Sequence, residues 1–271
     1  MRQGGERSFL DSPAPIAFAH RGGADEAPEN TLPAFEAALA LGYTYIETDV
    51  RLTADGVLVA FHDTALDRVT DQTGCIGDLT LREVQAADAG YWFTPDGGQT
   101  VPFRGRGVTV PTLEEVLTRW PEVRVNIDPK ADVCLGPLYD LLRRLDARER
   151  VCVGAFSDRR IARFRALAQG RVCTSMARNA VAIAWAAARL GRMPRFGADC
   201  IQIPVSSNGI RVVDAAFVRA AHRAGLQVHV WTVNLAAEMT RLLDLGVDGI
   251  MSDRPSLLRT VLIGRDRWLL R

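Results

Sequence analysis

The sequence predicts an α/β protein with the (β/α)₈ barrel fold, and three observations support this fold class. Eight short runs rich in β-branched residues alternate with longer segments of helical periodicity along the 271 residues. Several helical segments stop at a glycine, which readily takes the left-handed conformation that ends a helix. Eight strand–helix units in about 250 residues are typical of this barrel. A doubly wound open sheet is the alternative, but Gly22-Gly23 does not supply the G-x-G-x-x-G loop expected after its first strand.

The predicted elements follow one another in a regular order. Strands are expected at residues 16–19, 45–52, 123–128, 151–154, 171–174, 200–204, 227–232 and 249–252. Helices are expected at residues 32–41, 112–119, 133–145, 158–168, 180–190, 213–224, 235–245 and 255–263. Residues 1–271 are therefore interpreted as a single barrel domain.

One unit departs from this order after the second strand. A short β segment at 57–61 is followed by a long stretch, residues 64–110, before the next helix. This stretch is rich in Gly, Asp and Thr, and it contains a short helical piece at 81–87 and the aromatic run Tyr91-Trp92-Phe93. Loops this long within a compact domain are usually functional. We predict that 64–110 is an insertion that caps one side of the barrel mouth, with a disordered surface loop as the alternative.

Composition and charge exclude several functional classes. The 33 basic and 32 acidic residues give a net charge of +1, which argues against a nucleic-acid partner. Lys130 is the only lysine among the basic residues. The five cysteines form no Cys-x-x-Cys pair and are typical of reduced thiols. No apolar leader precedes Ile16 and no apolar run is long enough to span a bilayer, which predicts a cytoplasmic protein without a transmembrane segment.

Carboxylates gather where the second and third predicted strands end, and this end of such a barrel carries its chemistry. Strand alternation places Glu47 and Asp49 on one face of the second strand. It also places Asn126, Asp128 and Lys130 on one face of the third strand. Three converging carboxylates repel one another unless a cation lies between them. Ligation by oxygen alone suits Mg²⁺, Ca²⁺ or Mn²⁺ rather than zinc, so Glu47, Asp49 and Asp128 predict a divalent metal site.

The other polar residues at these strand ends suit phosphodiester cleavage. Arg21 and Lys130 would bring fixed positive charge beside the metal, which is how a phosphate is held. Cleavage needs one group to take a proton from the nucleophile and another to give one to the leaving alkoxide. Histidine, with a pKa of about 6.5, can do both near neutral pH. His20 and His62 are therefore the candidate acid and base.

Two aromatic residues are candidates for a wall of the substrate pocket, and the two remaining histidines are not expected to take part in catalysis. Trp231 is predicted to form a wall of the substrate pocket, and Phe156 is a further candidate for that wall. His222 lies late in a polar helix face, and His229 points into the barrel below the site. Both histidines are interpreted as structural.

The same residues resemble the motifs of the glycerophosphodiester phosphodiesterase family. The matching motifs span roughly residues 15–260. In chain order they are His20-Arg21-Gly22, Pro28-Glu29-Asn30-Thr31, Glu47-Thr48-Asp49-Val50, Asp55-Gly56, His62-Asp63, Leu66-Asp67-Arg68, Leu79-Thr80, Pro111-Thr112-Leu113-Glu114-Glu115, Asn126-Ile127-Asp128-Pro129-Lys130, Trp231-Thr232-Val233-Asn234 and Ser252-Asp253-Arg254-Pro255. The resemblance implies a (β/α)₈ barrel with a small insertion after strand two.

The resemblance also implies a role for each site residue. It makes His20 and His62 the general acid and base, Glu47, Asp49 and Asp128 the metal ligands, Arg21 and Lys130 the phosphate ligands, and Glu29 and Asn30 supports of the loop after the first strand. One position departs from the pattern, because the family most often has glutamate where this chain has Asp128. Aspartate is one methylene shorter, which bears on the identity and affinity of the metal.

Three functional hypotheses follow. The first is metal-dependent hydrolysis of glycerophosphodiesters, the deacylated remains of phospholipids, to sn-glycerol 3-phosphate and an alcohol. The second is cleavage of lysophospholipids, with the acyl chain against Tyr91-Trp92-Phe93 and Trp185. The third is a non-catalytic phosphate-binding barrel, which predicts the loss of a histidine or a metal carboxylate, and this chain keeps all of them. The sequence leaves the head group and the oligomeric state open.

Overall fold

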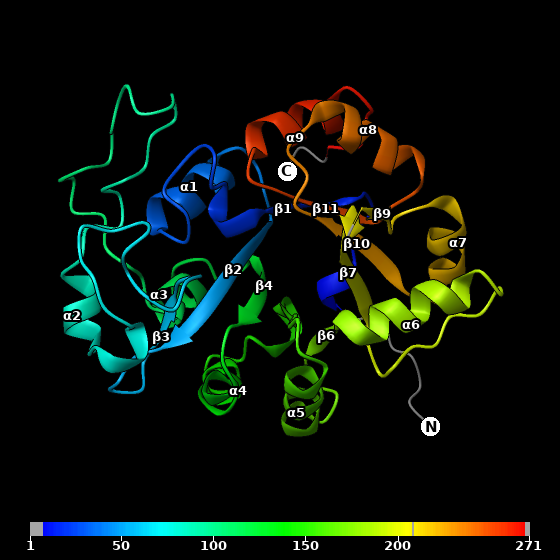
Figure 1. The fold of residues 1–271 in the computed structure, drawn as a ribbon, viewed down its shortest axis with the longest axis horizontal. Helices are drawn as coiled ribbons and strands as arrows, with labels where there is room; N and C mark the ends of the chain where they lie inside the picture. Colours follow the sequence, from blue (N-terminus) through cyan, green and yellow to red (C-terminus); the bar gives the residue numbers. More distant parts are fainter. Residues whose placement is uncertain (1–7, 208, 269–271) are drawn as a thin grey trace.

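The chain forms a closed barrel of eight parallel strands. The computed structural model describes residues 8–207 and 209–268, and Figure 1 shows the helices arranged around the central strands. The strand order is β1-β11-β10-β7-β6-β5-β4-β2, and pairing of β1 with β2 closes the sheet. The parallel strands are β1 (Ile16–Ala19), β2 (Tyr45–Leu52), β4 (Arg124–Pro129), β5 (Val151–Val153), β6 (Cys173–Met176), β7 (Cys200–Pro204), β10 (Gln227–Trp231) and β11 (Gly249–Ser252). The predicted (β/α)₈ barrel is confirmed.

Helices cover the outside of the barrel and begin at the capping residues that the sequence provides. For example, Thr112 accepts a hydrogen bond from the backbone of Glu115 (3.0 Å), and the Glu115 carboxylate accepts one from the backbone of Thr112 (2.7 Å). None of the helices in the described part of the chain is both long and apolar enough to cross a bilayer. The α-helices are α1 (Leu32–Ala40), α2 (Leu81–Gln85), α3 (Leu113–Arg119), α4 (Leu135–Arg144), α5 (Asp158–Ala168), α6 (Arg178–Ala188), α7 (Ala215–Arg223), α8 (Ala236–Asp244) and α9 (Pro255–Ile263).

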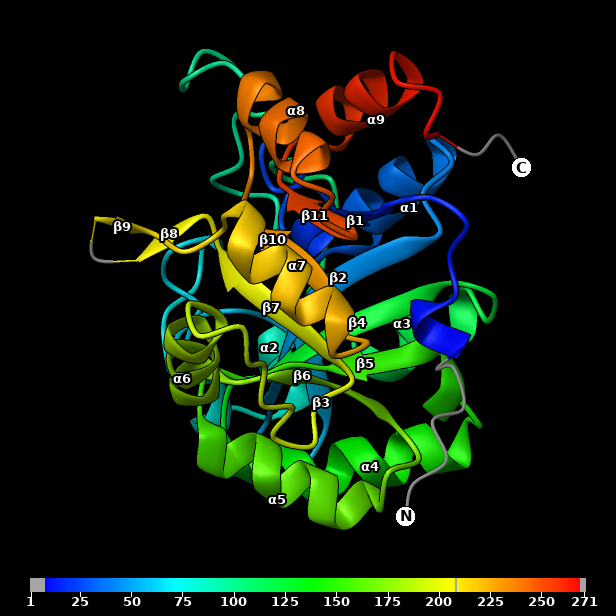
Figure 2. The same cartoon turned by 90° about the vertical axis from the view of Figure 1, so that its right-hand side faces the viewer.

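Short elements complete the two ends of the barrel. Phe9 lies fully buried against the rings of Phe18 and Tyr45 and closes the barrel from below. Figure 2 shows this N-terminal segment and the β8–β9 hairpin at opposite ends of the barrel. The short helices are η1 (Ser8–Leu10), η2 (His20–Gly22), η3 (Ile76–Asp78), η4 (Asp132–Cys134) and η5 (Arg148–Arg150), and the hairpin consists of β8 (Ser206–Ser207) and β9 (Ile210–Arg211).

Several element boundaries differ by one or two residues from the sequence prediction, among them the starts of α4, α7, β6 and α6. β6 begins two residues later than expected, because Arg171 still belongs to the turn that follows α5 and donates its backbone N–H to Ala168. α6 begins two residues earlier than expected, because its N-terminal backbone is capped by Asp158, which is distant in sequence. The β8–β9 hairpin was not predicted, since strands of two residues are too short to show periodicity.

Residues 64–110 fold as an ordered unit beside β3 (Leu58–Ala60), which pairs antiparallel to β2. Leu66, Ile76 and Val84 are buried together with Phe61 of the preceding segment. Trp92 donates its indole N–H to the carbonyl of Thr70 (2.9 Å). This segment lies on the outside of the barrel next to α1 and α3 (Figure 1).

Candidate active site

A cavity of about 660 Å³ opens at the C-terminal ends of the strands. It combines polar groups on β1, β2 and β4 with an apolar wall on the other side of the barrel. Nine of the residues predicted from the sequence line it: His20, Arg21, Glu47, Asp49, His62, Asp128, Lys130, Phe156 and Trp231. The two predicted supporting residues, Glu29 and Asn30, stand behind this lining and contact it.

The acidic side of the cavity is built by the pairing of β2 with β4. The register places Asp49 beside Asp128 and Glu47 beside Asn126, so their side chains leave the sheet on the same face. Glu47 and Asp49 are only 4% and 2% exposed. The sequence therefore brings two carboxylates on one strand next to a third on its neighbour, as alternation predicted.

Lys130 lies between two of these carboxylates. Its ammonium nitrogen is 2.6 Å from Oδ1 of Asp49 and 2.6 Å from Oδ2 of Asp128. Burial alone would lower the pKa of Lys130, but Asp128 and Asp49 outweigh it and raise the pKa. The single lysine of the chain is thus a fixed positive charge inside the cavity. The position of Lys130 in the cavity was predicted from the sequence, but its contact with both Asp49 and Asp128 was not.

The second oxygen of Asp49 is held from the loop after β1. Arg21 Nε lies 3.1 Å from Oδ2 of Asp49, and the side-chain amide of Asn30 donates to the same oxygen at 3.1 Å. Asn30 takes the left-handed conformation (φ 56°), and its amide oxygen accepts a hydrogen bond from Thr48 (2.8 Å). Burial would raise the pKa of Asp49, but Lys130 and Arg21 lower it. Asp49 is therefore a permanent carboxylate.

His20 is oriented by a residue that the sequence reasoning did not assign to the site. Asp253 accepts a hydrogen bond from Nδ1 of His20 (2.6 Å), and Asn234 donates to the other oxygen of Asp253 (2.8 Å). Burial would lower the pKa of His20, but Glu47 and Asp253 raise it above its ordinary value. The available signal was topological, because a closed barrel places β11 beside β1 and so brings residue 253 next to residue 20.

His62 has an equivalent partner in its neighbour along the chain. Asp63 accepts a hydrogen bond from Nδ1 of His62 (2.6 Å) and also pairs with Arg68. Arg68 bonds Glu29 with two nitrogens (2.9 and 2.6 Å), and Glu29 accepts from Arg21 (3.0 Å). Arg68 belongs to the 64–110 segment and was not predicted as a site residue. It connects Asp63, the support of His62, with Glu29, the support of Arg21.

The three predicted metal ligands fit a hard divalent cation by their chemistry. Burial, followed by the charge of Asp49, raises the pKa of Glu47 to about 7. Burial also raises the pKa of Asp128, whose Oδ1 is buried without a hydrogen-bond partner. Oxygen atoms that are buried and under-satisfied in this way are suited to bind a cation. The carboxylates do not close on one point, however, because Lys130 holds Asp49 and Asp128 around its ammonium group.

The opposite side of the cavity is apolar. Phe156, in the loop after β5, packs edge-on against Trp231, with ring centroids 5.3 Å apart. Val181 and Trp185 lie one turn apart on α6 and both reach the cavity. Among the described residues, none of the 64–110 segment lines it, so the aromatic run 91–93 is not part of this wall.

Comparison with known proteins places this arrangement in a family. Residues 20–257 match the model of the glycerophosphoryl diester phosphodiesterase family, and they include each of the histidines, cations and carboxylates described above. The chain belongs to this family. It is accordingly a phosphoric diester hydrolase, and the predicted family and enzyme class are confirmed.

Relatives and solved structures agree with this assignment. A probable glycerophosphodiester phosphodiesterase of Mycobacterium tuberculosis is 42% identical over 268 residues, covering 96% of this chain and 95% of that protein. A phosphodiesterase of Oleispira antarctica, solved in complex with the product sn-glycerol 3-phosphate, is 26% identical with a TM-score of 0.76 and covers 92% of this chain and 97% of that one. A lysophospholipase D of Mus musculus is 26% identical over 276 residues, covering 90% of this chain and 85% of that protein.

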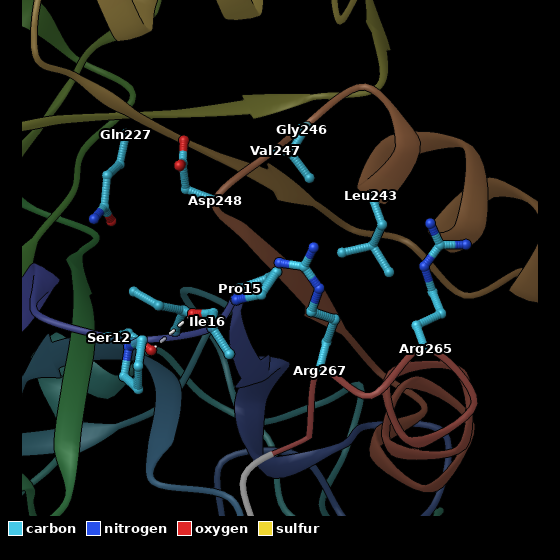
Figure 3. A pocket seen from close by; sticks show the side chains of 12 residues that line it. Ser12, Pro15, Ile16, Gln227, Leu243, Gly246, Val247, Asp248, Arg265 and Arg267 are labelled. Carbon is cyan, nitrogen blue, oxygen red and sulfur yellow. Dashed lines mark hydrogen bonds between the residues drawn. The ribbon is translucent and has the colours of Figure 1, made fainter.

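The phosphodiesterase has another hollow, of about 290 Å³, at the N-terminal ends of β1, β10 and β11 (Figure 3). Two of its charged side chains, those of Asp248 and Arg265, have partners within the fold. Asp248 accepts hydrogen bonds from His222 (2.8 Å) and from the backbone of Val228 (2.7 Å), and Arg265 pairs with Asp244. The candidate catalytic residues predicted from the sequence line the cavity at the other end of the barrel.

Proposed function

We propose that this phosphodiesterase hydrolyses glycerophosphodiesters to sn-glycerol 3-phosphate and an alcohol, with His20 and His62 as the acid–base pair. The observation that carries the proposal is that both imidazoles line one cavity and each has its Nδ1 held by a carboxylate. With Nδ1 engaged, Nε2 is the nitrogen left to exchange protons with a substrate.

The two histidines divide the proton transfers between them. Asp253 and Glu47 favour the protonated form of His20, so His20 is the better general acid for the leaving alkoxide. His62 then takes the proton from the attacking hydroxyl. If the free hydroxyl next to the phosphoester attacks first, a new P–O bond closes a cyclic phosphate while the P–O bond to the head-group alcohol breaks. Water opens the ring in a second step of the same kind.

A divalent cation is proposed at Glu47, Asp49 and Asp128, and it would polarise a phosphoryl oxygen when bound. Arg21 and Lys130 are proposed to hold the phosphate, because both present positive charge to the cavity. In this structure the Lys130 ammonium contacts Asp49 and Asp128, two of the proposed metal ligands. When substrate binds, we expect the ammonium to exchange part of these contacts for one with the phosphate. Mg²⁺, Ca²⁺ and Mn²⁺ all suit the oxygen ligands.

The 64–110 segment is proposed to support catalysis through Arg68, which positions residues of the site. Its aromatic residues do not cover the cavity. Arg68 pairs with Asp63, which holds His62, and with Glu29, which holds Arg21. The insertion would thus position two groups on the same side of the barrel mouth.

Lysophospholipids are a second candidate substrate class. The wall formed by Phe156, Trp185 and Trp231 is apolar, as an acyl chain requires. The likeness to a mammalian lysophospholipase D is consistent with such a substrate. Both candidates use the same diester and the same catalytic groups.

A substrate panel separates the two candidates and tests the metal. We expect glycerophosphocholine with Mg²⁺ or Ca²⁺ to release sn-glycerol 3-phosphate, and a chelator to abolish the release. Coupled detection of glycerol 3-phosphate measures this product. Lysophosphatidylcholine measured in parallel, by choline release, gives the ratio of the two kcat/KM values. Absence of turnover for every glycerophosphodiester, or unchanged turnover after chelation and dialysis, would contradict the corresponding part of the proposal.

Substituting the only lysine tests its proposed role. We expect Lys130→Arg to lower kcat/KM about 10-fold or more, because the planar guanidinium cannot occupy the point between Asp49 and Asp128 as a compact ammonium does. The barrel should stay folded by circular dichroism. The matched control is Arg143→Lys on the exposed surface of α4, which should keep full activity. Full activity of Lys130→Arg would show that the lysine is incidental.

A further inference from the structure

Three cysteines form a cluster inside the barrel, below the catalytic groups. Cys152 on β5, Cys173 on β6 and Cys200 on β7 are each at most 2% exposed. Their sulfur atoms all lie within 4.8 Å of one another, and those of Cys152 and Cys200 are 3.9 Å apart. The register pairs Cys152 with Asn126, which pairs with Glu47, but none of the carboxylates of the polar site belongs to the group of atoms within 4.8 Å of one another.

The spacing of the sulfur atoms matches a tetrahedral metal site. Zinc binds thiolate sulfur at about 2.3 Å, which puts two sulfurs of a tetrahedron about 3.8 Å apart. The measured separation of 3.9 Å between Cys152 and Cys200 is close to this value. Three sulfur ligands with one nitrogen are a common structural zinc set.

The next strand offers a candidate fourth ligand, His229, whose ring would have to move toward the cysteines because neither of its nitrogens lies within 4.8 Å of all three sulfur atoms. His229 on β10 is fully buried, and its Nδ1 has no hydrogen-bond partner among the described residues, while Nε2 contacts Gln227 (3.1 Å). In the pairing of β10 with β7, Cys200 lies opposite Gln227 and His229 lies opposite Gln202, so His229 is two residues further along the ladder than Cys200. A buried imidazole nitrogen without a partner is costly unless something binds it.

We propose that Cys152, Cys173, Cys200 and His229 form a structural zinc site. Binding of Zn²⁺ to three thiols and a neutral imidazole forms three Zn–S bonds and one Zn–N bond, releases three protons and leaves the centre with one negative charge. The site would link strands with short ladders, because only two residue pairs join β5 to β6 and two join β6 to β7. It would stabilise the barrel without taking part in phosphodiester cleavage.

The zinc is measured in the wild-type protein, and the atoms that surround the metal distinguish the cysteine site from the carboxylates. The protein is expressed in zinc-supplemented medium, and a second sample is refolded with Zn²⁺, since the buried site has no open entry. We expect about one zinc per chain by elemental analysis, with X-ray absorption showing sulfur neighbours at about 2.3 Å. Cys173→Ala should remove this zinc, whereas Cys134→Ala should not, because buried Cys134 stands apart from the cluster.

Three further measurements separate loss of zinc from loss of folding. Circular dichroism of metal-free Cys173→Ala shows whether the variant is folded, and His229→Phe should retain sulfur neighbours but release zinc more readily to a competing chelator. Zinc should raise the Tm of the wild-type protein and leave that of Cys173→Ala unchanged. Folded wild-type protein without sulfur-bound zinc after both preparations would overturn the proposal, as would equal amounts of sulfur-bound zinc in Cys173→Ala and Cys134→Ala.

Discussion

Replacing His20 by alanine is expected to lower kcat for a glycerophosphodiester by about 10²–10⁴-fold, the usual effect of losing a general acid or base. The substitution removes the imidazole that Asp253 orients and leaves Glu47 without its nearest imidazole nitrogen, 3.7 Å away. Steady-state kinetics with glycerophosphocholine measures the loss. Because the substitution removes a proton donor rather than a binding group, KM should change much less than kcat.

His222→Ala is the matched control for this experiment. His222 also pairs with an aspartate, Asp248, but it lies on α7 at the other end of the barrel. Its removal should leave kcat unchanged. If His20→Ala retained wild-type kcat, or if both variants lost activity equally, a direct catalytic role of His20 would be untenable.

Asp49→Asn is expected to have the second large effect, on stability as well as on activity. Asp49 is the buried partner of both Lys130 and Arg21, so neutralising it leaves two cations without their common counter-charge. Breaking a buried pair from one side costs about 3–5 kcal/mol. Loss of this proposed metal ligand, which also orders Lys130 and Arg21, should lower kcat/KM by at least about 10²-fold. Urea unfolding and steady-state kinetics measure the two effects.

An exposed ion pair provides the comparison. Glu114 bonds Arg144 with both oxygens on the surface, and Glu114→Gln should lower the unfolding free energy by less than about 1 kcal/mol. Equal destabilisation by Asp49→Asn and Glu114→Gln would mean that Asp49 is not the electrostatic centre of the site. A destabilised Asp49→Asn variant with full activity would exclude it as a metal ligand.

Much of the fold could be predicted because its main signals are local. Alternation along β2 and β4 is visible in the sequence, and so is the capping box at Thr112. The boundaries that differed depend on contacts between distant residues. Asp158 caps α6 from about twenty residues away, and Ser175 and Met176 extend β6 only because they pair with β7. Neither the cap from Asp158 nor the pairing with β7 can be recognised from the residues next to these boundaries.

In the candidate site too, features that depend on neighbouring residues could be predicted, whereas contacts between residues distant in sequence could not. Carboxylates at alternate positions of one strand share a face in any sheet, so their convergence could be inferred without coordinates. The partners of the two histidines could not be inferred equally well. Asp63 is adjacent to His62, whereas Asp253 reaches His20 only through the pairing of β1 with β11. The position of Lys130 between two carboxylates depends on side-chain geometry that spacing does not encode.

The contact between His20 and Asp253 has a consequence for the time at which the enzyme becomes active. The two residues are 233 positions apart, and the strand that delivers Asp253 is the last of the barrel. During translation His20 emerges early and must wait for almost the whole chain to be synthesised before its orienting carboxylate arrives. Contacts of such long sequence separation form late and slowly. With His20 as the proposed general acid, a chain that ends before β11 is expected to lack activity, because its imidazole would have no orienting carboxylate.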